Sequence, residues 1–414
     1  MKKVVFVLSL ILGCIAMGFG GFYLARYRMT ENIQTVAQAS TPPIAPPQVV
    51  SGDAVGTGGA ADITEITFSA SGDNLIHSYI YNQARERTND GSYDFSFAYE
   101  KVAKLFNKTD INWINQETLV TDTLEPDTFP TFSTPGDVAR ALYDINFRIF
   151  NISTNHTYDQ GADGLTQSVK FWKSMPDVLA TGLVKGEKYE NIPIYEKEGV
   201  KFAFLSYTYG TNGLTVPEDS KYHVILLSQK DVIRSQMKLA RELADVVVVS
   251  CHWGNEDSHT VTDEQRSTAK MLTRLGADLI IGTHPHVVQD AEWVEAKGRR
   301  AFCAYSLGNF ISGQSIADNL IGVTLTLTFE VHEDLLNDTF RVIIKDPKLI
   351  PNITDYRSSH ADLRVFWLKN YTRDLADTHG VRGYDSRFSY DYIFSVLKDN
   401  ISSEFLKLPK KKKS

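Results

Sequence analysis

Short apolar runs rich in β-branched and aromatic residues alternate with helical patterns along most of this chain. Runs of this kind, bounded by polar or turn-forming residues, are typical of strands. They predict strands at residues 66–71, 111–115, 147–153, 200–207, 246–251, 279–281 and 301–306. Apolar positions with helical spacing predict helices between them, at residues 138–142, 164–173, 231–243 and 263–275. This alternation favours a layered α/β domain.

The helix expected at residues 263–275 has clear sequence signals at both ends. Thr262 and Gln265 have the spacing of an N-terminal capping box, and Gly276 suits the C-terminal cap. We place the ordered domain at residues 63–346. The remainder, 347–414, is less regular and is predicted to be a C-terminal extension that ends in a solvated lysine tail.

The N-terminus contains an uncharged run at residues 4–25, preceded by two lysines and closed by Arg26 and Arg28. This run is long enough to cross a bilayer, so residues 1–28 are predicted to be a transmembrane helix that anchors the protein. A lipoprotein signal ending at Cys14 and a cleaved signal peptide are the alternatives. The short N-terminus and long polar remainder favour a single-pass protein of the cell membrane with an extracytoplasmic body.

Residues 29–62 are rich in Ala, Gly, Pro, Ser and Thr, which predicts a flexible linker. Over the whole chain of 414 residues the net charge is -7, which argues against nucleic acid as a partner. Only three cysteines occur, which is no disulfide framework. Cys251 and Cys303 are expected to be buried thiols, and a disulfide between neighbouring strands is the alternative.

Polar residues gather where the predicted strands end, which is where α/β sheets place their functional groups. Carboxylates, amides and imidazoles are ligands for divalent metals. Each residue alone has a structural explanation, such as a turn aspartate or a core histidine, but five successive strand ends of this kind favour a metal site. The candidate ligands are Asp73, Glu117, Asn155, His252, His284 and His286.

The spacing of His284 and His286 is the strongest part of this pattern. In an extended loop, a two-residue spacing points both rings the same way, and Pro285 would stiffen that geometry. Two divalent cations roughly 3.5–4 Å apart can clamp a phosphoryl group and activate a water. The candidate ligands could hold one or two such ions (manganese, zinc or iron), and His156 remains as a candidate catalytic acid.

These motifs resemble those of the poly-γ-glutamate capsule synthesis family, CapA, within the calcineurin-like metallophosphoesterase superfamily. The resemblance covers roughly residues 66–312. Its most specific stretches are residues 276–286 (GADLIIGTHPH) and 305–310 (YSLGNF). It implies a metallophosphatase-like β-sandwich flanked by helices.

By the same resemblance, Asp73 and His286 would hold one metal and Glu117 would bridge to a second. Asn155, His252 and His284 would hold that second metal, and His156 would donate a proton. Two positions depart from the superfamily pattern. Leu75 stands where a further histidine ligand is usual, and the bridging residue is Glu117 rather than an aspartate. The first metal is therefore expected to bind more weakly, unless His77 replaces the missing ligand.

Two functions remain open from the sequence. The first is a membrane-anchored hydrolase in capsule or poly-γ-glutamate biosynthesis that cleaves a phosphoester or an amide bond. The second is a non-catalytic accessory or export subunit of a polyglutamate synthase complex. The partners implied are the membrane, that complex and its anionic polymer. Arg299, Arg300 and the lysine tail are the candidate contacts for such a polymer.

Overall fold

The structure is a computed structural model that describes residues 62–186, 188–334 and 339–409. The predicted anchor at 1–28, nearly all of the predicted linker at 29–62, and the lysines of the tail lie outside these residues. Within the described part of the chain, no helix combines the length and the apolar character that crossing a bilayer requires.

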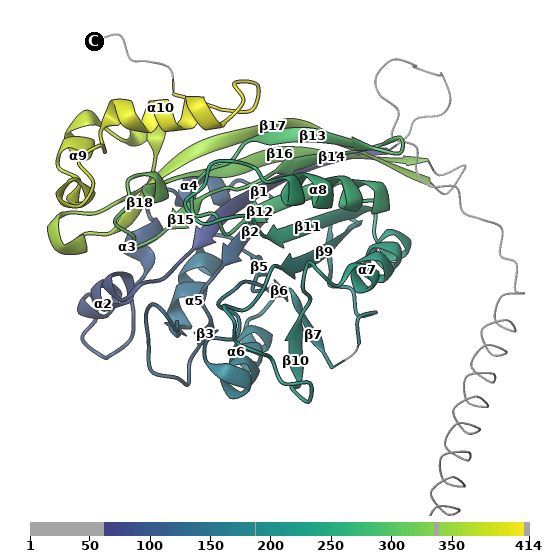
Figure 1. Cartoon of the computed structure of the whole chain (residues 1–414), viewed down its shortest axis with the longest axis horizontal. Coiled ribbons are helices and arrows are strands. Elements are labelled where there is room, and N and C mark those ends of the chain that lie inside the picture. Colours follow the sequence, from purple (N-terminus) through teal and green to yellow (C-terminus); the bar gives the residue numbers. More distant parts are fainter. Residues whose placement is uncertain (1–61, 187, 335–338, 410–414) are drawn as a thin grey trace, which may run out of the picture. The chain divides into compact units, whose positions relative to one another are not determined.

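Two large sheets form the body of the described domain (Figure 1). The first has the strand order β18 (Arg364–Trp367), β17 (Thr339–Asp355), β16 (Ile321–Asp334), β1 (Asp62–Asn74), β2 (Ile111–Gln116), β5 (Ile149–Asn151) and β6 (Leu179–Thr181), with β15 (Asn309–Ile311) also paired to β1. The second has the order β13 (Ala291–Ala296), β14 (Arg299–Ala304), β12 (Leu279–Thr283), β11 (Val246–His252), β9 (Val200–Thr208) and β8 (Ile194–Lys197).

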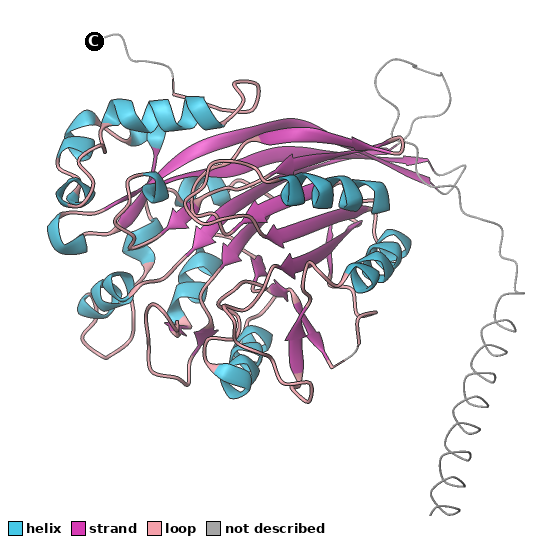
Figure 2. Cartoon of the chain, viewed as in Figure 1, coloured by secondary structure: helices cyan, strands magenta, loops and turns pink. Residues whose placement is uncertain are grey.

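The remaining elements flank these sheets (Figure 2). Two small sheets pair β10 (Tyr222–Val224) with β7 (Leu183–Lys185), and β3 (Val120–Thr121) with β4 (Thr134–Pro135). The helices are α2 (Ser78–Glu86), α3 (Ser96–Tyr99), α4 (Ala103–Phe106), α5 (Asp137–Asp144), α6 (Gly161–Ser174), α7 (Lys230–Leu243), α8 (Asp263–Leu275), α9 (Arg373–Asp377) and α10 (Tyr390–Asn400). The mixed α/β class expected from the sequence is confirmed.

Side-chain alternation along the strands builds one core between the two sheets and another under the helices. In β9, Phe202 and Phe204 face the first sheet, whereas Ala203 and Leu205 join the core that α7 and α8 cover. The Phe204 ring lies 6.5 Å from that of Phe68 in β1. The sheets therefore pack face to face, as in a β-sandwich with helices outside.

The predicted strands and helices all correspond to observed elements. Thr262 and Gln265 form both hydrogen bonds of the capping box at the start of α8, and Gly276 ends that helix with φ 109°. Glycine suits this left-handed position because it has no Cβ. Cys251 and Cys303 are free, buried thiols, as expected.

The C-terminal part differs from its predicted irregularity. Strand β17 runs from Thr339 to Asp355 and pairs with both β16 and β18, so the boundary expected after Asp346 falls inside a strand. Residues beyond it continue the first sheet, and α10 contributes Ile393 and Leu397 to the main core. The polar composition of this segment does not predict a strand. Its pairing with β16, which lies earlier in the chain, makes it one.

Replacing the aromatic contact between the sheets should destabilise the domain strongly. Phe68 is fully buried and touches rings from both sheets. Phe68→Ala should lower the free energy of unfolding by about 3–5 kcal/mol, because a cavity forms where the sheets meet. Chemical denaturation in EDTA would measure this. Tyr384→Ala, at a side chain that is 64% exposed, should change stability by less than about 0.5 kcal/mol. Equal losses in both variants would contradict the proposed core.

Candidate metal centre

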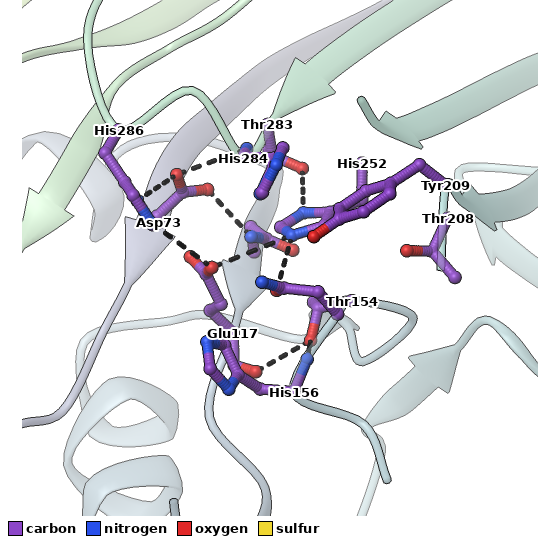
Figure 3. A network of polar contacts seen from close by, with 12 residues as sticks. Asp73, Glu117, Thr154, His156, Thr208, Tyr209, His252, Thr283, His284 and His286 are labelled. Atoms are coloured by element: carbon purple, nitrogen blue, oxygen red, sulfur yellow. Dashed lines mark hydrogen bonds and ion pairs between the residues drawn. The ribbon is translucent and has the colours of Figure 1, made fainter. Parts of the chain in front are cut away.

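The parallel strands in the middle of both sheets end at a common edge, and the polar residues predicted as ligands stand there. Asp73 lies at the end of β1, and Glu117 follows β2 directly. His252 is the last residue of β11, and His284 follows β12. Packing the two sheets face to face brings these strand ends together, as Figure 3 shows.

Two groups of three residues at this edge could hold metal ions. One consists of Glu117, His252 and His284, and the other of Asp73, Glu117 and His286. In each group, the candidate ligand atoms lie within 4.8 Å of one another. Glu117 belongs to both groups, which is the position expected of a bridging carboxylate. We call them the His252 triad and the Asp73 triad.

The distances between ligand atoms fit a common ion. Glu117 Oε1 lies 3.6 Å from His252 Nε2 and 3.8 Å from His286 Nε2. Asn155 Oδ1 lies 2.9 Å from His252 Nε2, which places a fourth candidate ligand beside the His252 triad. Two atoms bound about 2.1 Å from one ion at roughly 90–110° are about 3.0–3.4 Å apart. The triads are thus close to coordination geometry without rearrangement of the chain.

The Glu117 carboxylate provides the strongest test of whether an ion fits. The residue is 1% exposed, yet neither carboxylate oxygen has a hydrogen-bond partner. A buried carboxylate without a hydrogen-bond donor costs several kcal/mol, and the His286 ring, with Nε2 3.8 Å from Oε1, offers a counter-charge but no hydrogen bond. A cation bound between the triads would remove this cost, so the residues fit a metal.

Neighbouring polar side chains orient the ligands. His252 Nδ1 lies 2.9 Å from the Thr283 hydroxyl, and His286 Nδ1 lies 3.0 Å from Asn309 Oδ1. These contacts leave the Nε2 atoms of both rings facing Glu117. Hydrogen bonds of this kind fix ring orientation in metal sites.

The loop of His284 and His286 departs from the extended geometry expected for it. Both residues have positive φ, 98° for His284 and 60° for His286. The two rings lie 6.0 Å apart with a 59° angle between their planes, and each joins a different triad. Non-glycine residues in this region cost about 1–3 kcal/mol and occur most often at functional sites. The strained backbone is what allows one short loop to serve both triads.

Protonation differs between the triads. Burial and the Asp73 carboxylate raise the pKa of Glu117. Burial alone would lower the pKa of His286, but the carboxylates of Glu117 and Asp73 raise it to about 10. Burial, followed by neighbouring histidines, lowers the pKa of His252 and lowers that of His284 to about 3. At neutral pH the Asp73 triad therefore retains a proton, whereas the two histidines of the His252 triad are unprotonated.

His156, the candidate acid, lies beside this edge without joining either triad. Its Nδ1 is 2.7 Å from Asp159 Oδ2, and that carboxylate also accepts the backbone N–H of Phe132. The Phe132 ring meets the imidazole edge-to-face at 4.8 Å. The carboxylate and the ring hold His156 in one orientation and leave its Nε2 for other contacts.

Leu75 and His77 do not supply a further ligand. Leu75 is buried, and His77 belongs to neither triad. The backbone N–H of Gly313 donates to His77 Nδ1 at 3.1 Å, so that atom is already engaged. Among the residues that the structure describes, the Asp73 triad thus keeps three candidate ligands, against four around His252.

Tyr209 is a residue of the site that the sequence analysis missed. Its ring lies 4.5 Å from that of His284, and its hydroxyl donates to Asn212 Oδ1 at 3.2 Å. Asn212 in turn accepts from Asn155 Nδ2. Tyr209 follows β9 directly, so the rule that functional groups stand at strand ends would have found it.

Arg299 and Arg300, expected as polymer contacts, lie away from this edge. They begin β14, which runs parallel to β12, so they stand at the opposite end of the sheet from His284. Arg300 stacks on the ring of Trp293, 4.1 Å from its centroid. These arginines are therefore not part of the site at the triads, and their contact with a polymer stays a prediction.

A family model described as "Bacterial capsule synthesis protein PGA_cap" matches residues 67–314, more than half of the chain. The chain belongs to this capsule synthesis family. The PGA biosynthesis protein CapA of Bacillus subtilis (strain 168) is 27% identical over 247 residues, covering 59% of this chain and 62% of that protein. The capsule biosynthesis protein CapA of Bacillus anthracis is 30% identical over 189 residues, 43% of each chain. The matched regions thus span less than two thirds of both relatives.

Among solved structures, the NAD nucleotidase (NadN) of Haemophilus influenzae matches 83% of this chain and 57% of that chain, with 14% identity and a TM-score of 0.42. So weak a likeness carries no argument about this protein.

The family region itself begins in β1 and ends just after β15, so it contains every residue of both triads. Strands β16 to β18 and helices α9 and α10 of this family member lie beyond it.

Titration of the metal-free protein with Mn²⁺ or Zn²⁺ should show two unequal steps. The tighter step belongs to the His252 triad with Asn155, whose imidazoles are unprotonated. The weaker step belongs to the Asp73 triad, where the metal must displace the proton on His286. Its affinity should rise about tenfold per pH unit between pH 6 and 8, with about one proton released. Isothermal titration calorimetry in buffers of different ionisation enthalpy would measure both quantities.

Glu117→Gln provides the control for this titration. It preserves the shape of the side chain but removes the shared charge, so both steps should weaken. His286→Ala should abolish the weaker step alone. Two equally tight, pH-independent steps in the unmodified protein would contradict the difference between the triads.

Proposed function

We propose that this protein acts in the biosynthesis of a bacterial capsule polymer, poly-γ-glutamate, as a metal-dependent hydrolase that cleaves a phosphoester or an amide bond. The observation that carries the proposal is the buried Glu117 carboxylate, which lacks any hydrogen-bond donor and lies between two sets of imidazoles. Membership of the capsule synthesis family supports the biological setting. Cofactors of this class are manganese, zinc or iron.

Each group of residues has a separate role in this proposal. The triads would hold divalent cations that neutralise an anionic oxygen of the substrate and lower the pKa of a water. His156 would give a proton to the leaving group from Nε2, because Asp159 engages its Nδ1. Asp159 would keep the imidazole in that tautomer. Because His156 is nearly buried, bulk water would have little access to the proton that it donates.

We further propose that residues 1–28 anchor the protein in the cell membrane and that the described domain lies outside the cytoplasm. The long uncharged run and the linker that follows it support this placement. A polyglutamate synthase complex in the same membrane is the proposed partner, and its anionic polymer is the proposed substrate or cargo.

A non-catalytic accessory subunit is the second candidate function. The observation in its favour is Leu75, a buried apolar residue at the position where a fourth ligand would join the Asp73 triad. If the Asp73 triad, with its three candidate ligands, held no ion, one ion would remain in the His252 triad. That ion would serve a structural role. Catalytic tests of His156 separate the two candidates.

His156→Gln should lower the rate of hydrolysis about 10²–10⁴-fold, the usual contribution of a positioned acid, and leave the metal content unchanged. His284→Ala should instead lose metal, because it removes a direct ligand. Turnover of diphenyl phosphate, whose phenol leaves poorly without a proton, and elemental analysis would measure rate and metal separately. In a capsule-production assay, an accessory subunit would tolerate His156→Gln. Normal polymer from both variants would contradict the use of this site in either function.

The proposed location predicts the outcome of proteolysis in intact cells. A protease added outside should degrade the body and leave a short membrane-bound fragment that contains the anchor. A cytoplasmic protein serves as the control for cell integrity. Full protection of the body in intact cells, with degradation only after lysis, would contradict the extracytoplasmic placement.

A further inference from the structure

A cavity of about 650 Å³ adjoins the metal centre on the side of His284. Its walls come from the loop that follows β11, from the first turns of α8, and from Tyr209 at the end of β9. His284 lines the cavity and also belongs to the His252 triad. A ligand in this volume, which is typical of small-molecule sites, would therefore reach the metal ligands.

The charge of this cavity is negative. Glu256 and Glu264 line it, and no lysine or arginine does. Neither carboxylate forms an ion pair or a side-chain hydrogen bond with the described residues. Nearby acids differ in this respect, since Asp257 accepts a hydrogen bond from Asn319 and Glu292 pairs with Arg266. The two glutamates thus present unneutralised charge to the cavity.

The N-terminus of α8 does not reverse that charge. A helix N-terminus carries roughly half a positive charge, which is less than the two full negative charges of Glu256 and Glu264. The capping box of Thr262 and Gln265 already uses donors of the first turn. An anionic group would therefore be repelled from this cavity.

Aromatic rings complete the lining. Tyr209 is 45% exposed, and Trp253 forms part of the wall with its indole N–H donated to the carbonyl of Tyr305. With that donor engaged, Trp253 offers no polar group to a ligand. Aromatic faces beside carboxylates attract organic cations by cation–π and ionic contacts together.

We propose that this cavity is a subsite for an ammonium-bearing group of the substrate, held by Glu256 and Glu264 against Tyr209. The group to be hydrolysed then lies at the adjacent metal centre. This inference rests on the proposed hydrolase function and specifies its substrate. A polyanionic chain would enter with an amino end first, because its own carboxylates are repelled by the two glutamates.

Two matched probes test the proposal by binding alone. The first is 2-(trimethylammonio)ethylphosphonate, and the second is its isostere 3,3-dimethylbutylphosphonate, which keeps the anionic phosphonate but lacks the ammonium charge. Their C–P bonds resist hydrolysis, so the result does not depend on turnover. Calorimetry with the metal-loaded full-length protein should show at least about tenfold tighter binding of the cationic probe. The preference should shrink at high salt, because exposed carboxylates are screened.

Glu256→Gln and Glu264→Gln, singly and together, assign the preference to these side chains. The double variant should bind both probes within about twofold of each other, with unchanged metal content. Glu292→Gln is the control, because its carboxylate pairs with Arg266 outside the cavity lining. It should keep the full preference.

The outcomes separate the subsite from the enzyme. Equal binding of the two probes by the unmodified protein, or no binding of either up to about 10 mM, overturns the subsite. Persistence of the preference in the double variant also overturns it. Failure to hydrolyse p-nitrophenyl phosphocholine together with tight, charge-selective binding supports the subsite and overturns the phosphoester form of the hydrolase proposal.

Discussion

Burial of the Glu117 carboxylate without any protein donor is the constraint on which the rest of this site depends. A charge in that environment is stable only if a cation or a proton compensates it. The surrounding residues are arranged for both states. In the absence of metal, the pair of Glu117 and His286 retains a proton, since the pKa of His286 is raised to about 10. The same two side chains would hold one ion if metal bound, and the carboxylate would be shared with the His252 triad.

The sandwich architecture supplies the means to bury that charge. Each large sheet contributes strand ends to one edge, and the packing of Phe68 and Phe202 against the opposite sheet holds these edges together. The sheet core and the metal centre are therefore mechanically linked through β1, which carries Phe68 in its middle and Asp73 at its end. The positive φ values of His284 and His286 add local strain that this scaffold must compensate.

Charge is distributed unevenly around the centre. The triads would carry net positive charge once ions are bound, whereas the adjoining cavity presents Glu256 and Glu264. A substrate with an anionic and a cationic part would match both regions at once. In this chain of net charge -7, the triads with bound ions would attract an anionic group, and the adjoining cavity would repel further carboxylates of the same polymer.

The local pattern of the sequence determined the seven strands and four helices predicted from it and the capping box at Thr262, because these depend on periodicity and on neighbours within one turn. It also determined which residue types stand at the strand ends, and therefore the candidate ligands from Asp73 to His286. Only the tertiary structure decided that Asp159 orients His156, that Tyr209 joins the site and that β17 extends the first sheet beyond Asp346. It alone also decided the left-handed backbone of the histidine loop and the acidic cavity. These features arise from contacts between segments far apart in the chain. Such contacts cannot be predicted from the residues next to each segment in the sequence.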